Sequence, residues 1–197
     1  MRIFYINFLI IALLCSCMPD DFTLKTGKYN NDIINGYNKS VYGTYDDIND
    51  NTVMLKENGY VSLRRQGFTE LTTDITVELI EGEGVQFAIR CVKNKSENHP
   101  AILFTYSTSG SAVQERGKAS LAFPQYKAKI KEPVRIVFKN DCKRYDILLD
   151  CDTVYTGWTD IPNTDYLLVK SLPKSRVFLT GISMVEKNEN ENDKTMR

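Results

Sequence analysis

Four polar or aromatic side chains in the middle of the chain have the chemistry to bind a ligand rich in hydroxyl groups. Gln86 and Arg90 fall at alternate positions of one apolar segment, so both are expected on its polar face as hydrogen-bond donors. Tyr106 and the single tryptophan, Trp158, are expected to border that face and offer apolar ring surface for stacking. Structural roles are the alternatives: a cross-strand ion pair for Arg90, and a plug at one end of the fold for Trp158.

The chain shows none of the residue spacings that hydrolytic catalysis usually needs. Its one histidine, His99, lies in a polar stretch with no serine or cysteine motif beside it, so a nucleophilic triad has no support. Glu78, Glu81 and Glu83 do not recur at alternate positions of one strand, whereas glycoside hydrolysis requires two carboxylates in one cleft. We therefore assign no catalytic residue, leave enzymatic activity open and favour a binding role.

No metal or other cofactor is expected. A single histidine excludes sites with several histidine ligands. The segment from Asp47 to Asn51 has oxygen-bearing side chains at alternate positions, as a Ca²⁺ loop does, but it lacks the glycine and the final glutamate of such a loop. A polar turn is therefore favoured, with Ca²⁺ at residues 47–51 as the alternative.

The three cysteines in the body of the chain do not predict a disulfide. Cys142 and Cys151 flank residues 144–149, which have the pattern of a strand. At about 3.3 Å per residue they would lie about 25 Å apart, whereas a disulfide needs Cα atoms within about 7 Å. Cys91 alternates with apolar residues and is expected to be a small buried side chain.

Residues 1–17 (MRIFYINFLIIALLCSC) have the layout of an export signal: a positive start, then an apolar run too short for a transmembrane helix of about 20 residues. The run ends in Leu14-Cys15-Ser16-Cys17, which resembles the lipobox of bacterial lipoproteins. The resemblance implies cleavage after Ser16 and lipid attachment to Cys17, which would anchor the protein to a membrane. Cys15 as the acceptor, an ordinary secretory signal and an uncleaved anchor are the alternatives.

The acidic residues that follow, in Met18-Pro19-Asp20-Asp21, resemble the surface-export signals of some Bacteroidota lipoproteins. The resemblance implies a lipid anchor in the outer membrane, with the cell surface slightly favoured over the periplasmic leaflet. We divide the chain into a signal peptide (1–16), a lipidated tether (17–27), a folded domain (28–186) and a disordered polar tail (187–197).

Composition and periodicity predict an all-β domain. The 197 residues include 25 basic and 25 acidic side chains, so no net charge attracts nucleic acid, and 42% hydrophobic residues exclude a wholly disordered chain. No long segment outside the signal has helical apolar spacing. Strands separated by turn residues are expected instead, which is typical of a two-sheet antiparallel β-sandwich. The expected strands are 40–45, 59–65, 75–80, 85–92, 101–106, 134–139, 144–149, 153–156, 165–172 and 175–185, with a hairpin loop at 81–84 and a meander from 134 to 156.

Three segments resemble concanavalin-A-like lectin/glucanase jelly rolls, which include laminin G-like and 3-keto-disaccharide hydrolase-like domains. They are 59–91 (GYVSLRRQGFTELTTDITVELIEGEGVQFAIRC), 134–156 (VRIVFKNDCKRYDILLDCDTVYT) and 177–185 (VFLTGISMV). The resemblance implies a jelly roll with a ligand face on one sheet and places Arg90 on that face. The E-x-D-x-x-E pattern of the glucanases is absent.

Two classes of function follow. The first is a lipid-anchored, non-catalytic module of the bacterial cell envelope that binds carbohydrate or an envelope protein. The second, implied by the resemblance, is a glycan-processing enzyme similar to 3-keto-disaccharide hydrolases. A structural envelope lipoprotein that docks to protein neighbours is a further alternative.

Overall fold

The computed structural model describes residues 32–34, 37–49, 52–64, 70–93, 98–160 and 166–186. These residues form fifteen β-strands: β1 (Asp32–Ile34), β2 (Tyr37–Tyr42), β3 (Tyr45–Asn49), β4 (Thr52–Leu55), β5 (Tyr60–Arg64), β6 (Glu70–Glu81), β7 (Gly84–Lys93), β8 (Asn98–Ser107), β9 (Gly110–Glu115), β10 (Leu121–Phe123), β11 (Pro133–Asp141), β12 (Arg144–Leu149), β13 (Asp152–Trp158), β14 (Tyr166–Ser171) and β15 (Arg176–Glu186). None of the described segments is a helix of the length and hydropathy that crossing a bilayer requires.

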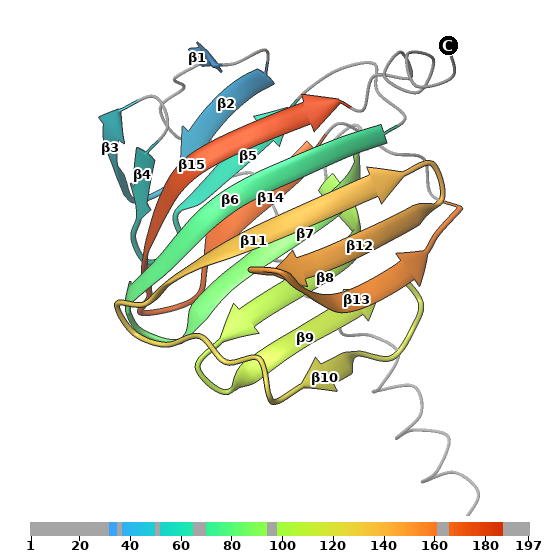
Figure 1. The fold of residues 1–197 in the computed structure, drawn as a ribbon. Coiled ribbons are helices and arrows are strands. Elements are labelled where there is room, and N and C mark those ends of the chain that lie inside the picture. The colour runs from blue at the N-terminus through green and yellow to red at the C-terminus, as the bar shows by residue number, and fades with distance from the viewer. Residues whose placement is uncertain are drawn as a thin grey trace, which may run out of the picture.

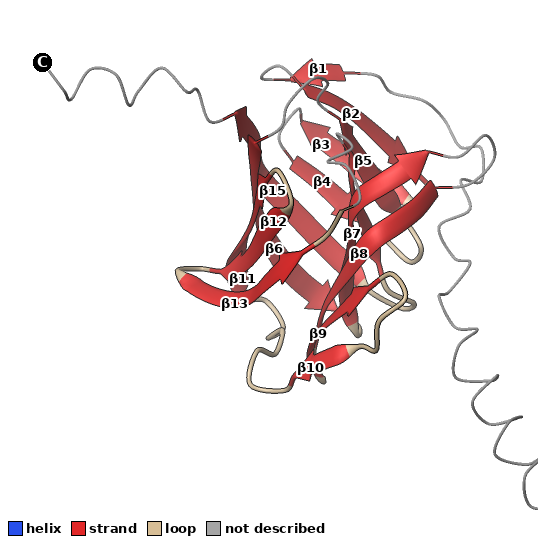
Figure 2. Cartoon of the chain, turned by 90° about the vertical axis from the view of Figure 1, so that its right-hand side faces the viewer, coloured by secondary structure: helices blue, strands red, loops and turns tan. Residues whose placement is uncertain are grey.

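The strands form two antiparallel sheets that pack face to face (Figure 1). The eight-stranded sheet has the order β1-β2-β5-β14-β7-β8-β9-β10, and the seven-stranded sheet has the order β13-β12-β11-β6-β15-β4-β3. The last strands of the two sheets, β10 and β13, lie on the same side of the sandwich (Figure 2). The prediction of an all-β, two-sheet antiparallel sandwich of jelly-roll type is confirmed.

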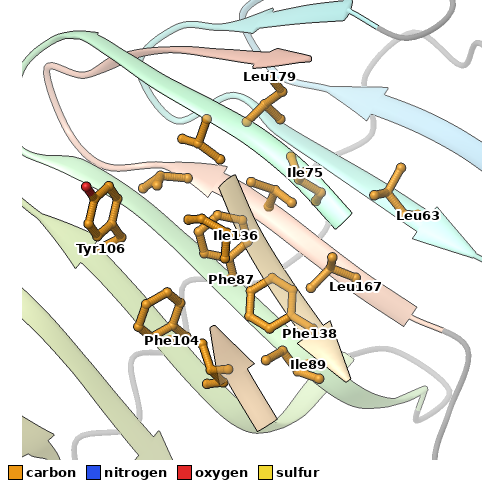
Figure 3. Packing of buried hydrophobic residues seen from close by; sticks show 14 of the residues in the cluster. Leu63, Ile75, Phe87, Ile89, Phe104, Tyr106, Ile136, Phe138, Leu167 and Leu179 are labelled. Atoms are coloured by element: carbon orange, nitrogen blue, oxygen red, sulfur yellow. The ribbon is translucent and has the colours of Figure 1, made fainter. Parts of the chain in front are cut away.

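Alternating apolar residues build the core between the sheets. In β6 every second residue from Leu71 to Leu79 is buried. Phe87 and Phe104 of the eight-stranded sheet meet Phe138 of the seven-stranded sheet, with its ring centroid 5.2 Å from that of Phe87 and 6.1 Å from that of Phe104 (Figure 3). Burying one such side chain contributes about 1.5–3 kcal/mol, so this contact is a main source of cohesion between the sheets.

The segment Glu81-Gly82-Glu83-Gly84, predicted as a hairpin loop, instead carries the chain from one sheet to the other. It joins β6 in the seven-stranded sheet to β7 in the eight-stranded sheet. The Ser175 hydroxyl accepts the backbone N–H groups of Glu83 (2.9 Å) and Gly84 (3.1 Å). At Gly82, φ is +94°, and a Cβ would lie 2.3 Å from the carbonyl oxygen of Lys174. Only glycine fits at this position. The Gly-rich pattern therefore predicted a turn, but it did not show that the two strands it joins lie in different sheets.

The strand predicted at 40–45 is divided. β2 ends at Tyr42 and β3 begins at Tyr45 in the other sheet, with Gly43 between them at φ +76°. The predicted meander is confirmed, because β11, β12 and β13 are consecutive neighbours in the seven-stranded sheet. The predicted signal peptide, the lipidated tether and the polar tail (187–197) lie outside the described residues.

Candidate functional site

Arg90, predicted on an exposed ligand face, is instead fully buried between the two sheets. Its Nε donates to Asn140 Oδ1 (3.2 Å) and its Nη2 to the carbonyl oxygen of Arg144 (3.2 Å), both in the opposite sheet. Burial lowers the pKa of its guanidinium. The cause of the error is the backbone: φ at Arg90 is +53°, a left-handed conformation that interrupts the strand alternation on which the prediction relied. Arg90 therefore joins the sheets.

Gln86 lies on the outer face of the eight-stranded sheet, half-buried, with its Nε2 donating to Thr105 Oγ1 (3.3 Å). Beside it on that face, Ala88, Leu103 and Leu168 form a small buried apolar cluster. The face predicted to be polar is therefore partly apolar.

Tyr106 points into the end of the sandwich and is only 8% exposed (Figure 3). Its hydroxyl donates to the carbonyl oxygen of Lys127 (3.2 Å). Burial raises the pKa of Tyr106, and the carboxylates of Asp150 and Glu132 add to this effect. The ring forms part of a pocket of about 210 Å³, which we call the end pocket; the lining residues are Tyr106, Gln125, Tyr126, Lys127, Lys129, Glu132, Pro133, Val134, Leu149, Asp150 and Asp152.

Residues 124–132 form a loop over the end pocket. Hydrogen bonds to the backbone of this loop hold it in place. The Ser111 hydroxyl donates to the carbonyl oxygen of Tyr126 (2.7 Å), and the Ala128 N–H donates to that of Ser107 (2.9 Å). The Lys131 N–H donates to the carbonyl oxygen of Leu79 in the opposite sheet (2.8 Å). The loop therefore presents its side chains from a fixed backbone.

The charged groups of the end pocket come from two sides. On the loop side, Lys129 pairs with Glu132 (2.8 Å). On the other side, the β12–β13 turn presents Asp150 and Asp152, and Asp150 Oδ1 accepts the backbone N–H of Arg135 (3.0 Å). Donors, acceptors and two tyrosine rings thus converge on one concavity, which is the usual composition of a small-ligand site.

Trp158 is 63% exposed, so the interpretation of this residue as a plug is wrong. It lies at the end of β13 with Arg144 directly opposite, and the same row continues through Asp141 in β11 to Glu70 in β6. In the neighbouring row, Asp146 Oδ1 accepts Arg144 Nε (3.2 Å) and the Thr156 hydroxyl (2.7 Å). One aromatic ring therefore stands among charged and hydroxyl-bearing side chains on the outer face of the seven-stranded sheet.

The four predicted ligand residues do not meet in one groove. Gln86 lies on one outer face, Arg90 between the sheets, Tyr106 in the end pocket and Trp158 on the opposite outer face. Of these four residues, only Tyr106 lines the end pocket. Most of the other polar pocket residues escaped prediction because they belong to the 124–132 loop and the β12–β13 turn, which have no sequence periodicity.

A buried carboxylate was also missed. Glu115, in β9, is 6% exposed. Its carboxylate accepts hydrogen bonds from the hydroxyls of Tyr145 (2.7 Å) and Tyr155 (2.8 Å), which belong to the opposite sheet. It also forms an ion pair with Lys118. Burial alone would raise the pKa of Glu115, but the hydrogen bonds from Lys118 and the two tyrosines outweigh it, so the pKa is lowered. This cluster, which we call the Glu115 clasp, ties β9 to β12 and β13. Its tyrosines are spaced as ordinary strand residues, so no sequence signal pointed to it.

Possible metal ligands meet at one place among the described residues. Carboxylate oxygens of Glu70 and Asp141 and the thiol of Cys142 lie within 4.8 Å of one another, but this exposed grouping alone does not identify a metal site. In the candidate Ca²⁺ segment, Asp47 and Asn49 belong to β3, and residues 50 and 51 lie outside the described residues.

The cysteines that flank β12, Cys142 and Cys151, are both free and exposed. Cys91 lies in β7, and its side chain is outside the described part of the chain.

Several solved structures are similar to this chain in fold. The carbohydrate binding module CBM66 from Bacillus subtilis matches with a TM-score of 0.54 and 14% identity, over 77% of this chain and 96% of that one. A variant of human galectin-16 matches with a TM-score of 0.51 and 12% identity, over 64% of this chain and 94% of that one. A mutant Trypanosoma rangeli sialidase displaying trans-sialidase activity matches with a TM-score of 0.59 and 11% identity over 80% of this chain.

This chain spans only 28% of that sialidase and 16% of another sialidase that it matches. No protein-family model and no curated protein sequence matches it. At these identities the similarity establishes the two-sheet β-sandwich fold.

Proposed function

We propose that this protein is a lipid-anchored lipoprotein of the bacterial envelope whose β-sandwich binds carbohydrate in the end pocket without cleaving it. The observation that carries the proposal is the convergence of Tyr106, Tyr126 and side chains of both charges on one concavity. The presence of the same sandwich in a carbohydrate binding module and a galectin supports the ligand class.

Each side of the end pocket has a part in holding a sugar. The partly exposed ring of Tyr126 offers apolar surface to the C–H face of a sugar ring, while the buried Tyr106 forms the floor of the pocket. Gln125 and Lys127 donate hydrogen bonds, and Asp152 accepts them. Neutral hydrogen bonds contribute only about 0.5–1.5 kcal/mol net each. A pocket of about 210 Å³ holds a small ligand, so the affinity for one sugar unit is expected to be roughly micromolar to millimolar.

One observation favours the alternative of a glycan-processing enzyme: three carboxylates, those of Glu132, Asp150 and Asp152, line the end pocket. All three residues are exposed, and Glu132 is paired with Lys129. The general acid of a glycosidase depends on burial among apolar side chains. None of these three carboxyl groups is buried in this way. Binding without cleavage is therefore the better-supported function.

The anchor in this proposal is lipid on Cys17, and it rests on the lipobox-like ending of the first seventeen residues. The proposed location is the outer membrane, and the resemblance of the acidic residues that follow Cys17 to surface-export signals supports the surface leaflet. Its partners are membrane lipid and carbohydrate.

The test is titration of the full-length protein in detergent with envelope, plant and host glycans. Asp152→Asn is the informative variant, because this exposed carboxylate has no partner among the described side chains; it is expected to weaken sugar binding roughly two- to tenfold. Asp46→Asn, in β3 at the far edge of the sheet, makes the same charge change away from the end pocket and is the control. Unchanged binding by Asp152→Asn would remove this pocket from the proposal. Turnover of any glycan would favour the enzyme, and no binding to any glycan would favour docking to an envelope protein.

A further inference from the structure

Strand β13 connects the end pocket to Trp158. Asp152, at its first position, lines the pocket, and Trp158 occupies its last position. At about 3.3 Å per residue these two ends lie about 20 Å apart. β13 is also the last strand of its sheet, so one of its sides carries no neighbouring strand among the described residues.

Between Asp152 and Trp158, the exposed side chains of β13 are polar: they are those of Thr153 and Thr156. Hydroxyl groups both donate and accept hydrogen bonds, and the free side of an end strand offers backbone N–H and C=O groups as well. These are the groups that a chain of sugar hydroxyls can bind.

The surroundings of Trp158 suit a sugar better than a protein surface. Its row across the sheet consists of Arg144, Asp141 and Glu70, so it does not belong to an apolar patch on this face. Protein interfaces place their aromatic residues in an apolar centre depleted of charge. A sugar instead presents an apolar C–H face to one ring while its hydroxyls reach charged neighbours, and Arg144 and Asp146 are placed to meet them.

We propose that β13 is a linear track for an extended glycan chain, whose end occupies the end pocket while Trp158 stacks on a sugar unit about 20 Å away. This inference rests on the proposed sugar binding in the end pocket. The ligand class becomes a polysaccharide or long oligosaccharide. Binding at two linked points raises affinity without any new contact at either point, so long chains are preferred over single sugars.

The experiment measures affinity against chain length. Full-length protein in detergent is titrated with glucan, xylan, galactan and mannan oligosaccharides, from the single sugar to chains longer than about 20 Å. Affinity for the recognised series is expected to rise with length until the chain spans the track, and then to stay constant. Trp158→Ala is expected to weaken long-chain binding by about tenfold or more, which corresponds to about 1.4 kcal/mol, and to leave the single sugar unaffected. Trp158→Phe should retain most of the gain.

Val185→Ala is the control, because Val185 is 57% exposed in β15, which is three strands away from β12 and four from β13. Affinity that does not depend on length overturns the track and leaves the end pocket standing. A length effect that survives Trp158→Ala overturns the role of Trp158 and with it the track. Binding of no sugar of any length overturns both this inference and the proposed function.

Discussion

Tyr145→Phe tests whether the Glu115 clasp holds the two sheets together. Tyr145 is 1% exposed, and its hydroxyl donates to Glu115 Oε1 at 2.7 Å. Glu115 keeps Tyr155 and Lys118 as partners in this variant, so no charge is left stranded. The substitution therefore removes a single hydrogen bond and almost no volume.

A hydrogen bond to a charged acceptor contributes about 1.5–3 kcal/mol. For a domain of this size that loss lowers Tm by about 3–12 °C. Urea unfolding followed by circular dichroism gives the free energy of unfolding, and Tyr45→Phe in β3, at the other edge of the same sheet, is the control. The control is expected to change stability by less than about 0.5 kcal/mol.

The loss of stability in Tyr145→Phe should also depend on pH. Burial tends to raise the pKa of Glu115, but the hydrogen bonds from Lys118 and the two tyrosines hold that pKa below its usual range. The ionised carboxylate therefore stabilises the fold above the unfolded pKa, and this contribution is lost as pH falls through the native pKa. Once Glu115 is protonated, its bond with Tyr145 is neutral and contributes about 0.5–1.5 kcal/mol. The stability difference between wild type and Tyr145→Phe should shrink in acid, and a difference that is equal at neutral and acidic pH would refute this reasoning.

Three further predictions follow from the structure. Gly157→Ala places a Cβ 2.3 Å from the pinned ring of Tyr145 and should cost about 1–3 kcal/mol; an unchanged Tm would contradict this. Arg90→Met leaves Asn140 Oδ1 without its donor and should lower the free energy of unfolding by about 1–3 kcal/mol, with sugar affinity unchanged at a temperature where the variant is folded; loss of affinity alone would restore Arg90 to the ligand site. Cys17→Ala should release the protein from membranes or leave it unprocessed in fractionation, and a variant that matures normally and stays in the membrane would contradict lipidation at Cys17.

The sandwich was predictable because apolar residues recur at alternate positions in several of its strands, most regularly in β6. Every second residue of β6 is buried, and the meander from β11 to β13 has turn residues at both of its corners. The pairing of strands was less accessible. Glu81-Gly82-Glu83-Gly84 has the composition of a hairpin loop, but its neighbour is Ser175, more than ninety residues away in sequence, and only the fold brings them together.

The site was less predictable than the fold because single residues broke the rules that the prediction used. Alternation placed Arg90 beside Gln86, and one left-handed backbone angle turned its side chain to the core. Tyr106 was identified from its aromatic ring alone. Its polar partners in the end pocket come mainly from one loop and one turn, whose positions depend on contacts such as Lys131 with Leu79 rather than on local spacing.

The ends of the two sheets also bear on crowding at the membrane surface that we propose for this protein. β1 and β10, the last strands of one sheet, have three residues each. β3 and β13, the last strands of the other, are each interrupted by a register shift, between Asp47 and Asn49 in β3 and opposite Ile147 and Leu148 for β13. Short or bulged outer strands make poor templates for a strand from another molecule. Many copies held side by side should therefore resist sheet-to-sheet aggregation, and β13 can stay open to solvent without recruiting a second copy of the chain.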